Sequence, residues 1–209
     1  MNRIRVKICG ITRPEDGVAA ASAGADAIGL VFFTGSPRAV GIDAANSIIR
    51  VLPPFITRVG LFVDAPEDYI RSVLNNVDLD MLQFHGSEPP VDCQQFGRPY
   101  IKAISMNPGI NLLEQSKKYD KAAGLLLDSH VPGKAGGTGQ TFDWSELPRD
   151  LKKPVILAGG LDADNVVVGI RRVRPYAVDV SGGVESAPGI KDREKIIRFI
   201  ERVGAYSDE

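Results

Sequence analysis

The chain alternates between short apolar runs and longer segments in which apolar residues recur every three to four positions. The runs are rich in Val, Ile and Leu and are apolar on both faces, as expected of parallel strands buried between a core and covering helices. The intervening segments have the spacing of helices that bury one face. The predicted strands are residues 5–9, 27–32, 57–63, 81–84, 101–104, 123–127, 155–157 and 177–180.

Two of the predicted helices begin at segments with the spacing of a capping box. Residues 12–15 read Thr-Arg-Pro-Glu and residues 64–67 read Asp-Ala-Pro-Glu. Each places a side-chain acceptor three residues before a glutamate, with a proline in the first turn. We therefore expect Thr12 and Asp64 to cap their helices. A last amphipathic helix is predicted over residues 191–203, with Ile, Phe and Val on one flank.

A repeating strand–helix unit is compatible with two architectures, an open doubly wound sheet and a closed (βα)8 barrel. Eight units of about 25 residues each favour closure, which gives a small TIM barrel with short loops. No linker or shift in composition divides the chain, so residues 1–209 are predicted to form a single (βα)8-barrel domain. The Gly-rich and Pro-rich residues 131–140 are predicted to form a loop that closes over a substrate.

Charge and composition narrow the range of partners. The 25 Lys and Arg residues balance 26 Asp and Glu residues, so neither nucleic acid nor an anionic membrane surface is an expected partner. No window approaches 18 consecutive apolar residues, and the first residues lack the apolar core of a secretion signal. Two cysteines do not form a disulfide framework. We expect a cytoplasmic protein with reduced thiols.

Candidate chemistry gathers where the predicted strands end, because the active site of a barrel forms at that end. Cys9 ends the first strand, a few residues before a helix N-terminus that can favour its thiolate over its thiol. Asp128 follows the sixth strand and precedes a glycine-rich stretch, which favours an acid facing a ligand. The alternatives are a small buried hydrophobic residue for Cys9 and a helix cap for Asp128. Cys93 has no such placement and is expected to be buried and inert.

Two glycine pairs follow the seventh and eighth predicted strands, where barrels usually bind phosphate. Gly159-Gly160 follows one strand, and Ser181-Gly182-Gly183 follows the other. Glycines allow backbone N–H groups to approach phosphate oxygens closely. The sequence therefore predicts a substrate that carries a phosphate group.

Arg38 lies after the second strand, in a loop stiffened by a proline, and can hold a carboxylate or a second phosphate in two hydrogen bonds. His85 follows the fourth strand. With His130 the only other histidine, no zinc site is expected.

Taken in order, these segments resemble the phosphoribosylanthranilate isomerase family of tryptophan biosynthesis over nearly the whole chain. The resemblance implies an Amadori rearrangement of N-(5-phosphoribosyl)anthranilate, a phosphorylated sugar joined to anthranilate, without a cofactor. The resembling segments are residues 7–12, 29–32, 36–38, 59–63, 83–86, 127–129, 136–139, 157–161 and 179–185.

The resemblance also implies a role for each candidate residue. Cys9 is the general base and Asp128 the general acid, while Arg38 holds the anthranilate carboxylate. His85 and Asp179 line the pocket. The residues that would bind the phosphate are Gly159, Gly160, Ser181, Gly182 and Gly183. The family usually has a second serine where this chain has Gly182, which removes one possible hydroxyl donor to the phosphate.

Three alternative functions are compared with this chain. The histidine-pathway aminoaldose isomerase would be expected to have an aspartate in place of Cys9, and a ribulose-phosphate epimerase would need more metal ligands than the chain supplies. A barrel that binds phosphate without turnover is the third, because a fold does not itself imply a reaction. The sequence does not distinguish a monomer from a homodimer.

Overall fold

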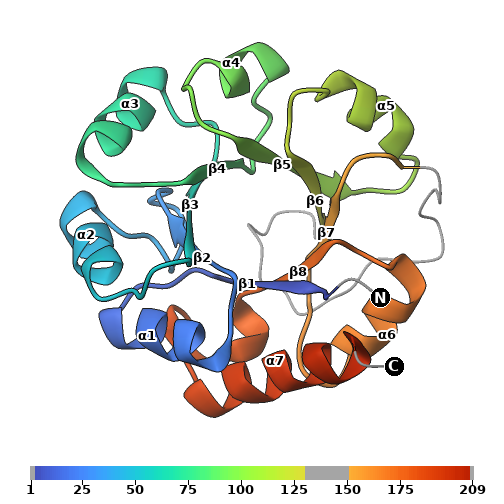
Figure 1. Cartoon of the computed structure of the whole chain (residues 1–209). Coiled ribbons are helices and arrows are strands. Elements are labelled where there is room, and N and C mark those ends of the chain that lie inside the picture. The colour runs from blue at the N-terminus through green and yellow to red at the C-terminus, as the bar shows by residue number, and fades with distance from the viewer. Residues whose placement is uncertain (1–2, 130–150, 208–209) are drawn as a thin grey trace.

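The computed structural model describes residues 3–129 and 151–207 and forms a closed barrel of parallel strands surrounded by helices (Figure 1). Strands β1 to β8 pair in chain order, and β8 pairs with β1 to complete the circle. The predicted closed barrel is thus confirmed. The strands are β1 (Arg5–Cys9), β2 (Ala27–Val31), β3 (Thr57–Phe62), β4 (Met81–Phe84), β5 (Tyr100–Met106), β6 (Gly124–Ser129), β7 (Val155–Leu157) and β8 (Ala177–Val180).

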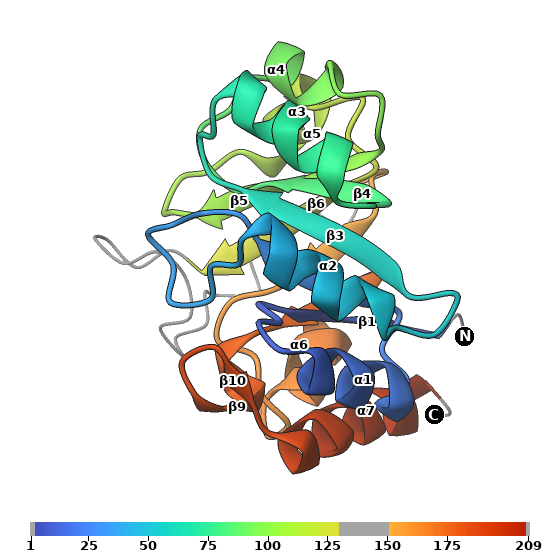
Figure 2. The same cartoon turned by 90° about the vertical axis from the view of Figure 1, so that its left-hand side faces the viewer.

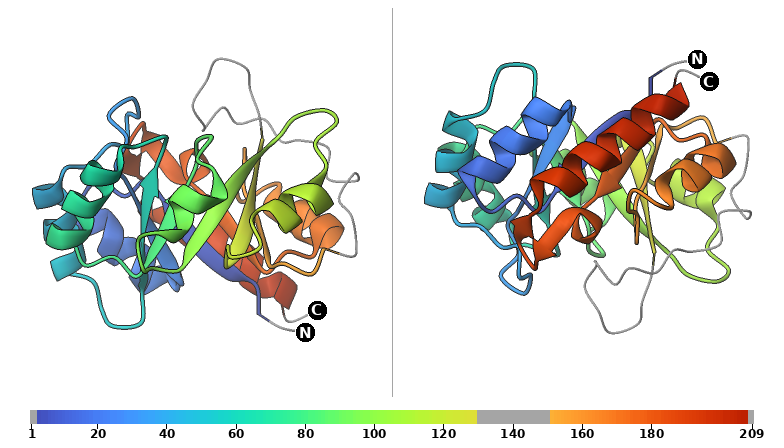
Figure 3. Two further views of the ribbon diagram at one scale, coloured as in Figure 1. Left: turned by 90° about the horizontal axis from the view of Figure 1, so that it is seen from above. Right: turned by 90° about the horizontal axis from the view of Figure 1, so that it is seen from below.

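The helices pack on the outer face of the barrel, as the perpendicular views in Figures 2 and 3 show. After β8 the chain adds a short 3-10 helix η2 (Gly182–Val184) and a two-stranded hairpin of β9 (Glu185–Ala187) and β10 (Ile190–Lys191). The helices are α1 (Pro14–Ala23), α2 (Ile42–Arg50), α3 (Glu67–Asn76), α4 (Pro90–Gln94), α5 (Leu112–Lys118), α6 (Val166–Val173) and α7 (Arg193–Ser207). Within the described residues, no helix is long and apolar enough to cross a membrane.

The observed strands differ from the predicted ones mainly at β5 and β6. The prediction ended the sixth strand before Asp128, whereas Asp128 and Ser129 lie within β6. They pair in parallel register with Ser105 and Met106 of β5, which is also longer than predicted. Mutual pairing extends both strands past their apolar residues, because each supplies the hydrogen bonds that the other needs. Asp128 is therefore held on a strand and not on a loop.

Both capping-box predictions are wrong. The Thr12 hydroxyl donates to the carbonyl of Gly189, and α1 begins after Arg13 without a side-chain cap. Asp64 instead accepts from the backbone N–H of Ser87 at 2.6 Å, and α3 also begins uncapped. In both places the side chain forms a hydrogen bond with a residue distant in the chain, and not with the helix that local spacing predicted it to cap.

The last helix begins two residues later than predicted. The Asp192 carboxylate accepts from the backbone N–H groups of Glu194 and Lys195 at 3.0 and 3.1 Å, which is the geometry of an N-cap. Lys191 consequently lies outside the helix, in β10, and its side chain is buried. The predicted apolar flank is present, with Ile196 and Phe199 fully buried.

The strand β1 shows how the barrel separates its two packing layers. Val6 and Ile8 belong to the large apolar cluster between the strands and the helices. The alternate residues, Lys7 and Cys9, lie on the other face of the strand, which is the barrel interior. Lys7 therefore carries a charge into the barrel, directly below Cys9.

Candidate active site

A cavity of about 740 Å³ opens at the carboxyl ends of the strands. Residues from both sides of the barrel line it, so it is the place where the ends of the eight strands converge. All ten residues predicted from the sequence lie on its wall, although their individual roles remain predictions. They are Cys9, Arg38, His85, Asp128, Gly159, Gly160, Asp179, Ser181, Gly182 and Gly183.

Cys9 is almost fully buried, with 6% of its surface exposed, at the edge of this cavity. Its neighbour on β2 is Gly29. A Cβ atom on Gly29 would lie 2.7 Å from the Cys9 sulfur and 3.1 Å from the Lys7 ammonium nitrogen. The glycine therefore leaves the space in which the sulfur and the ammonium group approach each other.

Lys7 is also paired with Asp179 across the β1–β8 register. The Lys7 Nζ atom lies 2.8 Å from Oδ1 of Asp179, and both side chains are buried. Burial lowers the pKa of Lys7, but the carboxylate of Asp179 outweighs it and raises that pKa above its ordinary value. Lys7 is thus a permanent cation beside Cys9.

The Cys9 thiol has a pKa above its ordinary value because burial disfavours the thiolate. The charge of Lys7 is the largest opposing influence, and Asp179 adds to the increase. Helix α1 begins only at Pro14, so the contribution of its N-terminus to the thiolate stays a prediction, and burial is the largest influence on this pKa.

On the opposite side of the cavity, Asp128 of β6 contacts His85, which follows β4. The Asp128 Oδ2 atom lies 3.0 Å from His85 Nε2, and His85 Nδ1 lies 2.9 Å from the amide nitrogen of Gln83. His85 thus links the Gln83 amide to Asp128, and the tautomer of its ring decides which atom of each pair donates. The His85 and Asp128 side chains are 25% and 15% exposed, so this side is accessible to solvent.

In each of the two glycine segments, neighbouring backbone atoms pack closely against one glycine. Gly159 has a left-handed φ of 82°, and a Cβ there would lie 2.3 Å from the Ser129 nitrogen and 2.8 Å from Asp128 Oδ1. A Cβ on Gly183 would lie 1.9 Å from the Leu161 carbonyl oxygen. Glycine is therefore required at both positions, where the loops after β7 and β8 close one wall of the cavity.

Arg38 already binds a carboxylate of the protein. Its Nε and Nη2 atoms each donate to one oxygen of Glu185 at 2.7 Å. Lys191 donates to Glu185 Oε1 at 2.8 Å and lies 3.1 Å from the Ser181 carbonyl oxygen. The guanidinium still lines the cavity. Its orientation is set by Glu185, which lies in β9 after the last strand of the barrel.

The sequence reasoning missed several residues at this site. Lys7 could have been found as a charged residue inside an otherwise apolar strand. Glu185 and Gln83 lie in segments that carry the family resemblance, but neither was assigned a role. No feature of the sequence singled out Lys191, because it was predicted to lie in a helix.

Some predictions concern residues that the structure does not describe. His130 and the predicted loop of residues 131–140 lie outside the described residues. Within residues 3–129 and 151–207, no three His, Cys, Asp or Glu side chains are grouped so as to hold a metal ion.

Comparison with known proteins identifies the family. Residues 6–202 match the family model of N-(5'-phosphoribosyl)anthranilate (PRA) isomerase. The N-(5'-phosphoribosyl)anthranilate isomerase of Azotobacter vinelandii is 57% identical over 97% of this chain and 98% of its own length.

Solved structures of the same family superpose over nearly the full length. One, a phosphoribosylanthranilate isomerase in complex with reduced 1-(o-carboxyphenylamino)-1-deoxyribulose 5-phosphate, has a TM-score of 0.85 and 38% identity over 97% of this chain and 99% of its own. Another comes from the dimeric isomerase of Thermotoga maritima, in a form converted to monomers, with a TM-score of 0.84 and 36% identity over 96% of this chain and 98% of its own. The chain belongs to the phosphoribosylanthranilate isomerase family.

Proposed function

We propose that this chain catalyses the Amadori rearrangement of N-(5-phosphoribosyl)anthranilate to 1-(2-carboxyphenylamino)-1-deoxyribulose 5-phosphate, a step of tryptophan biosynthesis. The observation that carries the proposal is the presence of one thiol, Cys9, and one carboxyl group, Asp128, in the wall of a single cavity that also contains two glycine-rich loops. The relatives named for this activity support it.

In the proposed mechanism, Asp128 acts first as a general acid. It gives a proton to the furanose ring oxygen as the C1–O bond breaks, and the lone pair of the anthranilate nitrogen forms a C=N bond to C1. The product of this step is an open-chain iminium cation. Solvent then restores the proton to Asp128 at this partly exposed site, where His85 Nε2 lies 3.0 Å from the carboxyl group and hydrogen-bonds to it.

Cys9 then acts as the general base. Its thiolate takes the proton from C2, and the C2–H electron pair moves to form the C1–C2 double bond while the iminium nitrogen is neutralised. Transfer of a proton to C1 and loss of the C2 hydroxyl proton give the ketone. The Lys7 ammonium beside the sulfur favours the thiolate, which burial disfavours. The cationic intermediate adds to this effect once it forms.

Turnover by the purified chain tests the proposal. The freshly made aminoaldose is added, and the loss of anthranilate-ring fluorescence is followed with the wild type and with two cysteine variants. Saturable turnover that Cys9→Ala abolishes and Cys93→Ala retains is the expected result, since Cys93 is a buried residue of α4 and does not line the cavity. Binding without turnover would favour the phosphate-binding barrel, and turnover of only the histidine-pathway aminoaldose would favour that isomerase.

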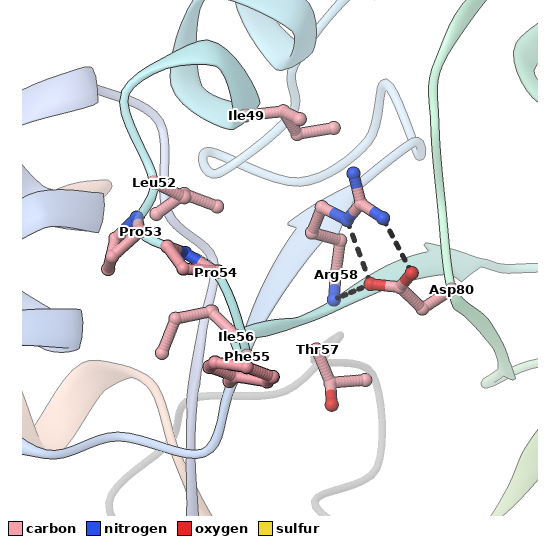
Figure 4. Close-up of a pocket in the computed structure, with 9 residues that line it drawn as sticks. All are labelled: Ile49, Leu52, Pro53, Pro54, Phe55, Ile56, Thr57, Arg58 and Asp80. Atoms are coloured by element: carbon pink, nitrogen blue, oxygen red, sulfur yellow. Dashed lines mark hydrogen bonds and ion pairs between the residues drawn. The ribbon is translucent and has the colours of Figure 1, made fainter.

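We also propose that two copies of the chain form a homodimer through the amino-terminal end of the barrel. Phe55 is 99% exposed there, in a backbone conformation with φ of 71°. It borders a pocket of about 460 Å³ lined by Pro53, Pro54 and the Arg58–Asp80 ion pair (Figure 4). A protruding aromatic ring beside a pocket is a self-complementary arrangement. The dimeric Thermotoga relative supports the assignment.

Sedimentation equilibrium of the wild type and of Phe55→Asp tests this dimer. We expect a dimer for the wild type and a monomer for the variant, with turnover retained because the pocket lies at the opposite end from Cys9. A wild-type monomer at micromolar concentration would overturn the proposal.

Finally, we propose that residues 1–209 act as one domain in the cytoplasm, a reducing compartment that suits the two free cysteines.

A further inference from the structure

Glu185 lies between two cations at the edge of the cavity, the partly exposed Arg38 and the buried Lys191. Its two oxygens accept from Arg38 at 2.7 Å each, and one of them also accepts from Lys191 at 2.8 Å. The side chains of Glu185, Arg38 and Lys191 are 6%, 13% and 0% exposed. Both cations hold the pKa of Glu185 below its ordinary value against the effect of burial, so the group is a carboxylate.

The cluster of Arg38, Lys191 and Glu185 contains two basic groups and one carboxylate. Two cations, Arg38 and Lys191, share the single carboxylate of Glu185, and burial raises the pKa of the nearby Cys9 and lowers that of Lys191. An uncompensated buried charge is unfavourable. The remaining guanidinium nitrogen of Arg38, Nη1, donates to no atom in the described part of the chain, and Arg38 lines the cavity. An anionic group in the cavity would therefore complete the cluster.

The cluster also reaches the loop predicted to bind phosphate. A Cβ on Gly10, where φ is 73°, would lie 2.5 Å from Cδ of Arg38 and 3.0 Å from the Ser181 hydroxyl oxygen. The arginine side chain therefore crosses the end of β1 next to Ser181. Lys191 lies 3.1 Å from the carbonyl oxygen and 3.3 Å from the hydroxyl oxygen of Ser181. One buried carboxylate thus fixes the orientation of two cations that both lie near this serine.

We propose that Glu185 is a positioning residue that orients Arg38, through two parallel hydrogen bonds, so that the free edge of the guanidinium binds an oxyanion of the substrate. The inference rests on the proposed function, whose substrate carries two such groups, a ring carboxylate and a phosphate. Glu185 occupies one edge of the planar guanidinium, and the planar geometry directs the other edge. Without this carboxylate, Arg38 keeps its charge but loses its fixed direction.

Ligand binding to Glu185→Gln tests the inference without depending on turnover. One probe is reduced 1-(o-carboxyphenylamino)-1-deoxyribulose 5-phosphate, and the second is the same compound without the ring carboxylate. Titration calorimetry gives Kd for both, with Glu201→Gln on the exposed face of α7 as the matched control. If Arg38 binds the carboxylate, Kd of the first probe rises about tenfold or more in Glu185→Gln, and Kd of the second stays within about twofold.

If Arg38 binds the phosphate, both probes weaken equally, which supports the positioning role and reassigns the anion. Unchanged Kd for both probes would overturn the inference. Should Glu185→Gln fail to fold, Arg38→Lys keeps the charge and removes the fork, and the same pattern of losses is expected. In an Arg38→Met background, Glu185→Gln should have no further effect. A wild type that binds neither probe would contradict the proposed function instead, so the two failures are distinct.

Discussion

The two sides of the cavity hold their functional groups in opposite ways. On the side of β1, β2 and β8, Cys9 is buried among Lys7, Asp179, Arg38 and Lys191, and the charged groups are joined in buried ion pairs. On the side of β4 to β6, Asp128 and His85 are partly exposed and joined in a short chain of hydrogen bonds. A base that must be made anionic needs fixed cations, whereas an acid that must be reprotonated needs access to water.

The largest effect is expected on the buried side, from Cys9→Ala. We expect kcat to fall by about 10⁴-fold or more, because alanine removes the thiol that takes the proton from C2 in the proposed mechanism. Binding of the reduced product analogue should be nearly unchanged. Single-turnover fluorescence measures the first quantity and calorimetry the second. Turnover close to the wild-type rate would remove Cys9 from the mechanism.

On the exposed side, Asp128→Asn should lower kcat by about 10²- to 10⁴-fold while preserving the shape of the side chain. Asp120→Asn, at an exposed position, is the control. The activity of the variant should not return at low pH, because an amide cannot supply the proton at any pH. A variant whose activity returns at low pH would point to another acid, with His85 the nearest candidate.

Lys7→Met tests whether the buried cation matters for the base. Burial already raises the pKa of Cys9, and Lys7 is the main influence that lowers it. Its removal should raise that pKa further, so that the thiolate forms only at higher pH. We expect kcat/KM near pH 7 to fall about tenfold and the rising limb of the pH profile to move to higher pH. Asp179, Arg38 and Lys191 also face Cys9, and they stay in place.

An unshifted profile for Lys7→Met, measured alongside the wild type from pH 6 to 10, would contradict the role of Lys7. Since this variant also leaves Asp179 without its partner, the double variant Lys7→Met with Asp179→Asn separates the two causes. If the shift persists in the double variant, loss of the cation is responsible.

Glu185→Gln gives the smallest predicted effect, on stability. The pKa of Glu185 in the folded protein lies below its ordinary value of 4.5, so its carboxylate contributes stability above pH 4.5 and loses that contribution as the pH falls through the lower folded value. The variant should therefore have a lower Tm than the wild type at pH 7, and the difference should narrow towards pH 3. Calorimetric scans across this range test it. A constant difference would show that the charge of Glu185 is not the cause.

The sequence was sufficient for the barrel and for ten residues of the cavity wall, because both follow from short apolar strands and the residues at their ends. The side-chain partners were not predictable in the same way. Arg38 and Glu185 lie 147 positions apart, and only the closure of the barrel brings them together. Thr12 failed as a cap for the same reason, since its partner is Gly189. Local spacing predicts elements, and the pairing of polar groups depends on the whole path of the chain.

The Gly159 backbone, packed against both Ser129 and Asp128, has a practical consequence for redesign. Any side chain introduced there to admit a bulkier phosphorylated compound would displace the acid, so the two properties cannot be adjusted independently. Gly183 is equally confined by Leu161. Engineering of substrate range should therefore begin in the segment that carries Arg38, where a change in preference need not disturb proton transfer.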